Sequence, residues 1–510
     1  MMQYPHTIPP YDHQIEALND HWGDEWFAVF WEQGCGKMKH GYDVAMTQWQ
    51  AGQIDAMVVI SPKGVHRDWI EEAFKEPNPN SIYDQPLIPP MWHNQIEADY
   101  YDTPKAKTKQ HQQRMKELLE TSKFSILSMA YSAARTKPNK KWMGGKLFLK
   151  EFLTRRKAIL ILDESSFIQT PSSDTTQVFN GYGGKGGVAP LAKSRRILEG
   201  TPVDEGPLNA YSQMEFLDRG FWRRHGVGSY TAFKAEFGIW KEIEAPNGRK
   251  VDICVGYKNL DKLHNILKPY YSRVLKDTAL DLPPKLYQHL RFDMSPEQWK
   301  IYNQLEEELH VFVQQEGKDY ESLITAELPI QLVLRQYQIT CGYLPFEEDV
   351  NGEPISGVIE FKENPRLEEG VKQLKKNTGK QVVWCRFTRD IELLQDQLGQ
   401  CAVRYDGKID DDLRAYNKRE FLKGDKQYLI CQIQAAARGH NFNICENVLY
   451  YSNDSRLRLR RQSEDRTHRG VMDFSVLYTD MLATDTVDEK RVKSLQKKLK
   501  TSNTILGDPQ

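Results

Sequence analysis

Short apolar runs recur along the chain, and each is followed by polar or glycine-containing residues and then by a helical pattern. The runs fall into two groups, which are 56–61, 124–129, 158–162 and 195–198, and then 381–385, 428–432, 447–451 and 474–478. They are too short for core helices and most are rich in β-branched residues, so we predict buried strands. Because strands that alternate with helices form parallel sheets covered on both faces, the pattern predicts an α/β protein with two lobes.

The segment between the two groups, roughly 205–345, is rich in aromatic residues and amphipathic stretches such as 296–308, and we predict that it is mostly helical. Pro283 and Pro284 cannot lie inside a helix, so we place the lobe boundary in the segment 276–287. The glycine-rich segment 181–187 is predicted to be a loop. We expect one lobe at 1–275 with a helical insertion near 205–275, a second at 276–495 with a helical insertion near 295–345, and a tail at 496–510.

Composition excludes several classes of protein. The 510 residues suggest roughly three domains' worth of core at ~150 residues per domain. No stretch approaches ~18 consecutive apolar residues, which excludes a transmembrane helix, and residues 1–10 lack the basic start and apolar run of a secretory signal. The seven cysteines include no C-x-x-C pair, which argues against a zinc ribbon or a disulfide scaffold. We therefore expect a soluble intracellular protein.

The formal net charge is −1, so any surface that binds a nucleic acid or a membrane must be local. Residues 101–157 hold 15 Lys and Arg against 4 Asp and Glu. A second basic segment, 456–469, contains Arg456, Arg458, Arg460, Arg461, Arg466 and Arg469. Such patches bind phosphate backbones without reading sequence, although exposed helix faces are the alternative for 101–157 and the preferred interpretation of 490–500. We assign none of the eleven tryptophans to base stacking.

A glycine loop with a lysine lies near the beginning of the chain. Residues 34–37 (GCGK) follow a predicted strand at 27–31 and precede a helical pattern. In such a unit the backbone N–H groups and the helix dipole face an anion, and the lysine reaches the β- and γ-phosphates of a nucleotide. A tight turn between strand and helix is the alternative interpretation.

Two adjacent carboxylates, Asp163 and Glu164, follow the apolar run at 158–162. At the end of a strand, one carboxylate can hold Mg²⁺ while the other polarises an attacking water. An acidic turn at a strand edge is the alternative, but the glycine loop earlier in the chain favours the first interpretation.

Two arginines, Arg466 and Arg469, are three positions apart, and we predict that they share one helix face. Guanidinium groups stabilise the charge that develops on a γ-phosphoryl group during its transfer. A solvated basic helix is the alternative interpretation.

These motifs, taken with others in the same order, resemble the Swi/Snf family of ATP-dependent DNA translocases within the helicase-like superfamily two. In the first half the similar segments are 11–18 (YDHQIEAL, the adenine-recognition motif), 31–37 (WEQGCGK), 58–72 (VVISPKGVHRDWIEE), 163–166 (DESS, with Ser166 where the family usually has His), and 199–202 with 211–217 (EGTP and YSQMEFL). In the second half they are 271–285 with 294–298 and Tyr302 (the connector between lobes), 404–407 with Arg414 and Phe421, 434–442 (QAAARGHNF), and Gln462, Asp465, Arg466, His468 and Arg469. The resemblance covers roughly residues 8–495.

Besides Ser166, the chain departs from the family pattern at three places. Met38 takes the position where a Ser or Thr hydroxyl normally binds Mg²⁺, and a water molecule can fill that position because Mg²⁺ usually keeps several waters. Gly470 and Val471 replace the usual Ile-Gly. The segment 454–461 (DSRLRLRR) replaces an aromatic-and-proline segment and puts basic groups where the family contacts a DNA strand.

The resemblance implies two RecA-like parallel-sheet lobes that bind ATP and Mg²⁺ in the cleft between them and move along duplex DNA of any sequence. The catalytic residues that it implies are Lys37, Asp163 (which would hold Mg²⁺), Glu164, Arg466 and Arg469. The implied ATP-binding residues are Gln14, Gly34, Cys35, Gly36, Lys37 and Met38. The residues implied to couple nucleotide state to DNA are Lys63, Thr201, Gly439, Asn441 and Gln462.

Two other functions remain open at this point. One is a degenerate motor that binds nucleotide or DNA as a recruitment module, which Met38 motivates. The other is strand separation, branch migration or annealing, on branched DNA or on RNA. For the motor we expect a monomer on DNA, no membrane association, and a place in the cytoplasm of a bacterial cell or a phage-infected host.

Overall fold

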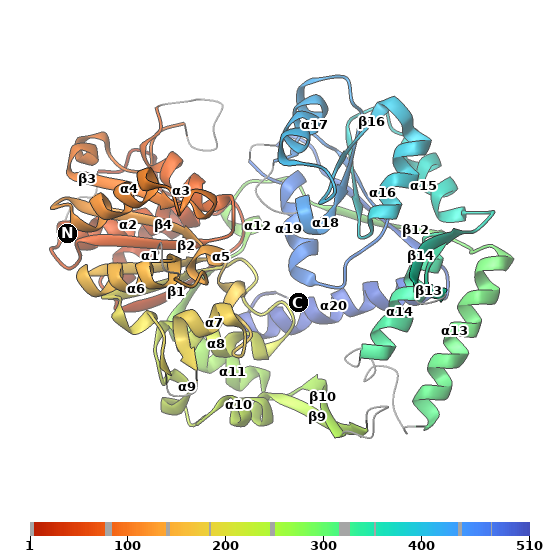
Figure 1. Ribbon diagram of the computed structural model, residues 1–510, viewed down its shortest axis with the longest axis horizontal. Coiled ribbons are helices and arrows are strands. Elements are labelled where there is room, and N and C mark those ends of the chain that lie inside the picture. Colours follow the sequence, from red (N-terminus) through yellow and green to blue (C-terminus); the bar gives the residue numbers. More distant parts are fainter. Residues whose placement is uncertain are drawn as a thin grey trace. The chain divides into compact units, whose positions relative to one another are not determined.

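The computed structural model describes residues 5–76, 84–138, 143–182, 185–244, 250–315, 327–350, 353–436, 441–470 and 472–509. The chain forms two compact units (Figure 1). The first consists of Met1–Phe237, Asn259–Asp281 and Ser502–Gln510, and the second of Gly238–Lys258 and Leu282–Thr501. The division at Asp281 and Leu282 falls beside the two prolines that cannot enter a helix.

The first unit is built on a seven-stranded sheet with the strand order β11-β1-β8-β5-β2-β4-β3, and every pairing in it is parallel. The strands are β1 (Trp26–Trp31), β2 (Ala56–Ser61), β3 (Ile96–Tyr101), β4 (Phe124–Ala130), β5 (Ala158–Asp163), β8 (Ser194–Leu198) and β11 (Tyr271–Val274). Because the strands are parallel, the segments that follow β1, β5 and β8 meet at one edge of the sheet.

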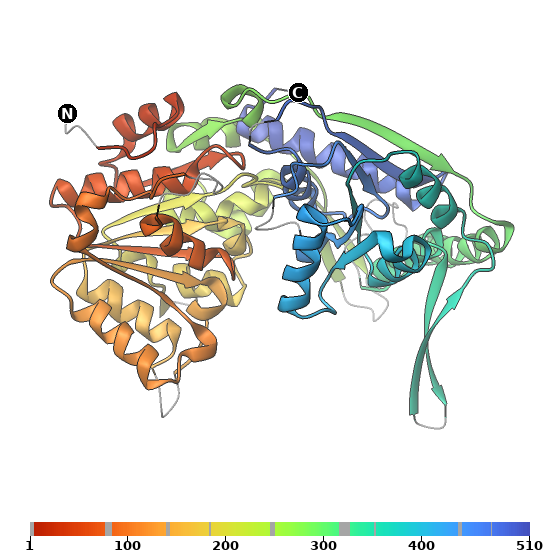
Figure 2. The same cartoon turned by 90° about the horizontal axis from the view of Figure 1, so that it is seen from above.

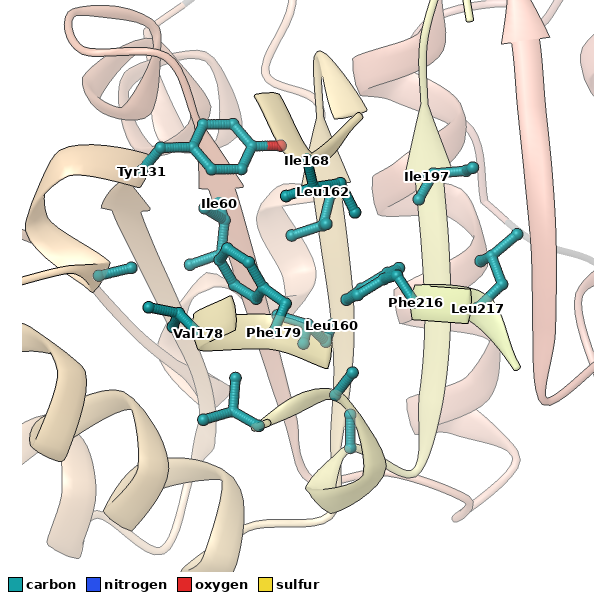
Figure 3. Close-up of a cluster of buried hydrophobic side chains, with 14 of the residues drawn as sticks. Ile60, Tyr131, Leu160, Leu162, Ile168, Val178, Phe179, Ile197, Phe216 and Leu217 are labelled. Carbon is teal, nitrogen blue, oxygen red and sulfur yellow. The ribbon is translucent and has the colours of Figure 1, made fainter. Parts of the chain in front are cut away.

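Alternate residues of one strand belong to two different cores. In β2, Val58 and Ile60 belong to one hydrophobic cluster, whereas Met57 and Val59 belong to another. The sheet is therefore buried on both faces, as a parallel sheet requires. Figure 3 shows part of the first cluster, in which Phe179 and Phe216 lie beside the inward side chains of β5 and β8.

Helices cover these faces. They are α1 (Asp12–His21), α2 (Lys37–Gln50), α3 (Val65–Phe74), α4 (Lys109–Glu120), α5 (Tyr131–Ala134), α6 (Gly145–Arg155), α7 (Asp174–Asn180), α8 (Ala210–Leu217), α9 (Phe221–Arg224), α10 (Tyr230–Phe237), α11 (Leu260–Leu267) and α12 (Lys276–Ala279). Short 3₁₀ turns occur at Pro90–Gln95, Thr103–Lys105, Ser165–Ile168, Ala189–Leu191, Pro207–Asn209 and Lys268–Tyr270.

The second unit contains a six-stranded parallel sheet with the order β12-β19-β18-β15-β17-β16. Its strands are β12 (Leu286–Phe292), β15 (Gln381–Cys385), β16 (Ala402–Tyr405), β17 (Tyr428–Gln432), β18 (Asn447–Tyr450) and β19 (Leu477–Ala483). Its helices are α13 (Pro296–Gln315), α14 (Glu327–Thr340), α15 (Pro365–Lys375), α16 (Thr388–Leu398), α17 (Asp411–Lys423), α18 (Ile433–Ala436), α19 (Leu457–Thr467) and α20 (Val487–Leu506), with a 3₁₀ turn at Gly399–Cys401.

Two antiparallel hairpins accompany the second sheet. They are β9 (Gly238–Glu244) with β10 (Lys250–Tyr257), and β13 (Tyr343–Val350) with β14 (Glu353–Glu360). The hairpin of β13 and β14 projects away from the sheet of the second unit (Figure 2). Helix α20 extends to Leu506, so the segment expected to be a tail from residue 496 is largely helical.

The predicted fold class is confirmed, because both large sheets are parallel and covered by helices. The predicted helix at 296–308 lies within α13. The predicted strand at 474–478 is displaced, since β19 begins at Leu477. The middle segment was predicted to be mostly helical, and it also contains β9, β10, β11 and β12.

Within the glycine-rich segment that was predicted to be a loop, residues 181–182 and 185–186 form two short strands. Gly181–Tyr182 (β6) pairs antiparallel with Lys185–Gly186 (β7). A Cβ atom on Gly187 would lie 1.9 Å from the carbonyl oxygen of Phe179, so close backbone packing requires that glycine.

Within the described ranges, none of the helices has the length and apolar character that crossing a membrane needs.

Candidate functional site

The glycine loop lies between β1, which ends at Trp31, and α2, which begins at Lys37. Gly34 and Gly36 have φ angles of +93° and +78°, and side chains rarely adopt this left-handed region. A Cβ atom on Gly36 would also lie 2.2 Å from Nε2 of Gln14. The two glycines therefore allow the loop to turn directly into the N-terminus of a 14-residue helix, where backbone N–H groups favour an anion.

Helix α1 holds this loop in place through two consecutive side chains. Gln14 donates from Nε2 to the carbonyl oxygen of Gly36 at 2.9 Å and accepts from the backbone N–H of Tyr11 at 2.9 Å. Nε2 of His13 lies 2.9 Å from the carbonyl oxygen of Cys35. Gln14 is buried against the loop and Cys35 is buried in the core. Gln14 thus lies beside the phosphate loop, and its contact with adenine stays a prediction.

Lys37 and Asp163 lie at the same edge of the first sheet. The Lys37 ammonium donates to the carbonyl oxygens of Trp31 at 2.8 Å and Glu32 at 3.1 Å. Oδ2 of Asp163 accepts from Nε1 of Trp69 at 3.0 Å. Burial raises the pKa of Asp163 above its ordinary value, although the Trp69 hydrogen bond and the charge of Lys37 oppose the rise. Burial is therefore the main influence on this carboxyl group.

Glu164 occupies an unusual backbone conformation, with φ 56° and ψ 57°. A residue with a Cβ rarely enters this left-handed region, and such strained residues cluster at functional sites. The turn brings the Glu164 carboxylate to the glycine loop, where it accepts from Nε2 of Gln33 at 3.4 Å. The hydroxyl of Tyr131, labelled in Figure 3, donates to the carbonyl oxygen of Asp163 at 2.9 Å and fixes the turn from the core side.

Glu199 is a buried carboxylate that the sequence analysis did not assign to the site. Its Oε2 accepts from the backbone N–H of Ser166 at 2.8 Å. Its Oε1 accepts from the N–H groups of Gly200 at 3.0 Å and Thr201 at 3.1 Å. Glu199 therefore ties the acidic segment after β5 to the segment after β8. Its position directly after a buried strand, like that of Asp163, is the signal that would have identified it.

Three other residues that were predicted to belong to the site, Met38, Lys63 and Thr201, differ in how far their side chains are exposed. Met38 is half-buried and packs against the hydrophobic cluster that contains Val29 and Trp31. Lys63 is exposed in the turn between β2 and α3, and the backbone of Thr201 is held by Glu199. Of these three side chains, Lys63 alone is exposed to solvent.

In the second unit, Arg466 and Arg469 lie at the end of α19. Arg466 is buried, and its Nε donates to the carbonyl oxygen of Gln462 at 3.1 Å. The prediction that both arginines share a helix face is wrong, because α19 ends at Thr467 and His468 has left the helical conformation. His468 instead contacts a distant part of the chain, because its Nε2 lies 2.7 Å from the carbonyl oxygen of Pro283.

The segment 441–443 lies beside the two arginines. The backbone N–H of Phe442 donates to the carbonyl oxygen of Arg466 at 2.6 Å, and Nδ2 of Asn443 donates to that of Arg469 at 3.1 Å. Asn441 accepts from the N–H of Asn443 at 3.3 Å. The structure thus brings together the two last predicted motifs, although Gly439 lies outside the described residues.

Arg460 belongs to a buried charge cluster and not to a basic surface. It donates to Glu464 at 2.7 Å, to Asn453 at 2.8 Å and to Oδ2 of Asp480 at 3.1 Å. Its guanidinium carbon lies 3.6 Å from the ring centroid of Tyr450. With Arg460 and Arg466 both buried, the prediction of a phosphate-binding patch over 456–469 does not hold for these two side chains.

Glu464 extends this cluster to Lys285 and Tyr287, at the beginning of strand β12 of the same unit. It accepts from Nζ of Lys285 at 3.2 Å and from the hydroxyl of Tyr287 at 2.9 Å. Burial works to raise the pKa of Glu464, but Lys285 and then Arg460 outweigh it, so the pKa lies below its ordinary value. The carboxylate is therefore charged and fixes helix α19 to the sheet.

The first unit thus combines a strand, a glycine loop and a helix N-terminus that favours an anion with two carboxylates at the same sheet edge. Comparison with known families gives two matches. The SNF2-related domain matches residues 36–342 and the helicase conserved C-terminal domain matches residues 364–471. The first match covers more than half of the chain, and the chain therefore belongs to the SNF2-related family, as the sequence motifs predicted.

Curated relatives include the CHD3-type chromatin-remodeling factor PICKLE of Arabidopsis thaliana, 23% identical over 61% of this chain. The DNA annealing helicase and endonuclease ZRANB3 of Mus musculus is 23% identical over 69%, and the ATP-dependent helicase brm of Drosophila melanogaster is 21% identical over 70%. The chain spans 22%, 30% and 22% of the lengths of these relatives. A SWI2/SNF2 ATPase core of Sulfolobus solfataricus in complex with dsDNA superimposes with a TM-score of 0.39 at 15% identity, over 100% of this chain and 99% of that chain.

Proposed function

We propose that this chain hydrolyses ATP at the sheet edge where β1 and β5 end, and that hydrolysis drives its movement along duplex DNA. The observation that carries the proposal is the grouping of Lys37, Asp163 and Glu164 beside a glycine loop. Strands β1 and β5 both pair in parallel with β8, so Lys37 and Asp163 follow strands that end at the same sheet edge, and Glu164 contacts the loop through Gln33. A cation, a metal-binding carboxylate and a water-activating carboxylate are the groups that phosphoryl transfer to water requires.

The residues present suit ATP with Mg²⁺. The N–H groups of the loop would bind the phosphates, and the Lys37 ammonium would exchange its carbonyl partners for phosphate oxygens. Asp163 would hold Mg²⁺, which neutralises phosphate charge when bound, and one protein carboxylate is enough because Mg²⁺ keeps several waters. Glu164 would take the proton of the attacking water, and Gln14 would contact adenine.

The second unit would supply the remaining groups. Arg466 and Arg469 would stabilise the charge that develops on the γ-phosphoryl group once the two units close. Thr201, Gly439, Asn441, Gln462 and the exposed Lys63 would couple the nucleotide state to DNA. Thr201 is suited to this role because Glu199 links its backbone directly to the segment after Glu164.

The test is ATP turnover by the purified chain without nucleic acid and with duplex DNA, single-stranded DNA or RNA. We expect duplex DNA to raise the rate the most. A chain that shows no stimulation by any DNA would contradict the proposal. Stimulation by RNA alone would indicate that the chain moves along RNA and not along DNA.

Basic side chains beside α4 offer a surface for the DNA backbone. Lys105, Lys107 and Lys109 are all exposed. Each phosphate contact contributes about −0.9 to the slope of log affinity against log salt concentration, so the triple Lys→Gln variant should lower the steepness of that slope by about 2.7. The measurement is duplex binding by fluorescence anisotropy at several salt concentrations. An unchanged slope would show that this surface is a solvated helix face.

Met38 motivates the alternative of a degenerate motor. Because a water molecule can replace the missing hydroxyl at Mg²⁺, we expect the wild-type chain to be active and Met38→Thr to change its maximal rate by less than about tenfold. The measurement is ATP turnover as a function of Mg²⁺ concentration. An inactive wild type that Met38→Thr rescues would favour the degenerate motor.

The similarity to an annealing helicase motivates a second alternative. Displacement of a third strand from a triplex would report movement along intact duplex, whereas forked and complementary single strands would report separation and annealing. We expect ATP-dependent triplex displacement.

A further inference from the structure

Arg273, in strand β11, contacts three separate segments at the edge of the first sheet. Its Nη1 donates to the carbonyl oxygens of Phe30 at 2.8 Å and Gly200 at 3.2 Å. Its Nη2 lies 3.5 Å from Oε1 of Glu32. One guanidinium group therefore joins the end of β1, the first residue of the glycine loop and the residue that precedes Thr201.

Asp508 binds the other side of the same guanidinium. Nε of Arg273 donates to Oδ1 at 2.9 Å and Oδ2 at 3.2 Å, and Nη2 donates to Oδ2 at 2.7 Å. The two side chains are only 9% and 4% exposed. Burial works to lower the pKa of Arg273, but Asp508 outweighs it and the net shift is upward. This is a buried two-pronged ion pair, the geometry that fixes an arginine most firmly.

The segment that carries Asp508 is itself anchored to the first unit. Ile505 and Leu506 are buried in the hydrophobic cluster of that unit. The carbonyl oxygen of Ile505 lies 3.0 Å from Nδ1 of His264, and that of Leu506 accepts from the hydroxyl of Tyr271 at 2.9 Å. Asp508 is therefore presented to Arg273 from a fixed position.

We propose that Asp508 and Arg273 are positioning residues for ATP hydrolysis, an inference that rests on the proposed function. The carbonyl oxygens of Trp31 and Glu32 accept hydrogen bonds from Lys37. Arg273 in turn donates to the carbonyl oxygen of Phe30 and pairs with the carboxylate of Glu32. Without Asp508 the guanidinium keeps only the longer ion pair with Glu32 and reorients toward it, which releases Phe30 and Gly200. A shift of about 1 Å in such groups costs about 100-fold in rate.

The experiment uses Asp508→Asn in the full chain, with ATP turnover measured at saturating duplex DNA. We expect kcat to fall by about tenfold or more while KM for ATP changes by less than about threefold, and we expect Asp508→Glu to recover part of kcat. The matched control is Glu25→Gln, because Glu25 binds Arg195 at 2.6 Å where β1 and β8 begin, at the opposite end of the strands. Equal kcat values in the two variants would overturn the proposal.

A second variant separates positioning from stability. Replacing a buried ion pair by apolar residues of similar volume usually preserves stability, so Arg273→Met with Asp508→Leu should fold while losing both side-chain hydrogen bonds, to Phe30 and to Gly200. We expect this double variant to keep the melting temperature of the wild type and still show the lowered kcat. A stable double variant with the kcat of the wild type would assign the pair a purely structural role.

A third readout does not depend on turnover. Without nucleotide, Asp508→Asn should increase amide hydrogen exchange in the segments 28–36 and 197–203, whereas Glu25→Gln should not. Unchanged exchange in both segments contradicts the positioning role, even if the wild type is an active ATPase. Absence of turnover in the wild type contradicts the proposed function, and a difference in exchange would then still show that Asp508 holds the loop.

Discussion

Replacing Glu164 with glutamine should lower the maximal rate of ATP turnover by about 10³-fold, in the middle of the range for loss of a positioned general base. Glutamine has nearly the same shape as glutamate and can keep the contact with Gln33, so the left-handed turn after β5 should form as before. The substitution removes only the ability to take a proton from water. Affinity for the nucleotide should therefore change by less than about threefold.

The measurement is phosphate release at saturating ATP and duplex DNA, together with the binding of a fluorescent ATP analogue. Glu97→Gln is the matched control, because Glu97 lies in the edge strand β3 of the same unit and its partner Lys123 is 3.8 Å away in an exposed pair. The control should turn over ATP at the wild-type rate. A Glu164→Gln chain that retains more than a tenth of that rate would show that another group activates the water.

Much of the fold follows from local pattern, because the central strands of both sheets are apolar on both faces. Strands β2, β4, β5, β15 and β17 lie where apolar runs predict them. Strands β3 and β12 were missed, since each lies at a sheet edge and carries polar side chains such as Asp99 and Gln288. Polar side chains are tolerated there because the faces of these edge strands are less covered, so that Gln288 is exposed and Asp99 is only half-buried.

The displaced prediction for β19 has a different cause. The strand continues through Thr479 and Asp480, which are buried, and a buried aspartate breaks the apolar pattern on which the prediction relied. Asp480 is tolerated in the sheet because Arg460, twenty positions earlier, neutralises it. The residue types around position 480 do not reveal that Arg460 neutralises Asp480.

The residues of the candidate site also divide into those that the local sequence predicts and those that it does not. Lys37, Asp163 and Glu164 could be predicted because the chain places each of them directly after a predicted strand or loop. The end of α19 could not, since the contact of His468 with Pro283 spans 185 positions. Asp508 likewise gave no signal, because its partner Arg273 is 235 positions away. Contacts between distant segments decide these parts of the site.

Replacing Arg460 with methionine should destabilise the second unit by about 3–5 kcal/mol, the usual cost of removing one partner of a buried ion pair. Asp480 and Glu464 would both lose the guanidinium while remaining buried. Lys285 would still neutralise Glu464, but Asp480 would keep only a neutral amide partner, Asn453. The cost therefore arises chiefly from an uncompensated aspartate in the interior of the sheet.

Urea unfolding followed by site-resolved labelling of the Cys385 thiol, which is fully buried in β15, reports on this unit. Arg460→Lys should be intermediate, because lysine keeps the charge but not the forked geometry that reaches Glu464 and Asp480 together. Lys372→Met is the control, since Lys372 pairs with Glu369 on the exposed face of α15 and should cost about 0.5 kcal/mol or less. Equal midpoints for Arg460→Met and this control would contradict the importance of the cluster.

The pH dependence of stability provides an independent check on the same cluster. The pKa of Glu464 lies below its ordinary value in the folded chain, so its contribution is present at neutral pH and is lost as the pH falls through that lowered pKa. Without Arg460, one of the three groups that lower this pKa is gone, Lys285 and Tyr287 remain, and burial still raises it. As the pH falls, the free energy of unfolding of Arg460→Met should therefore begin to decrease at a higher pH than that of the wild type. For Lys372→Met the decrease should begin at the same pH as in the wild type.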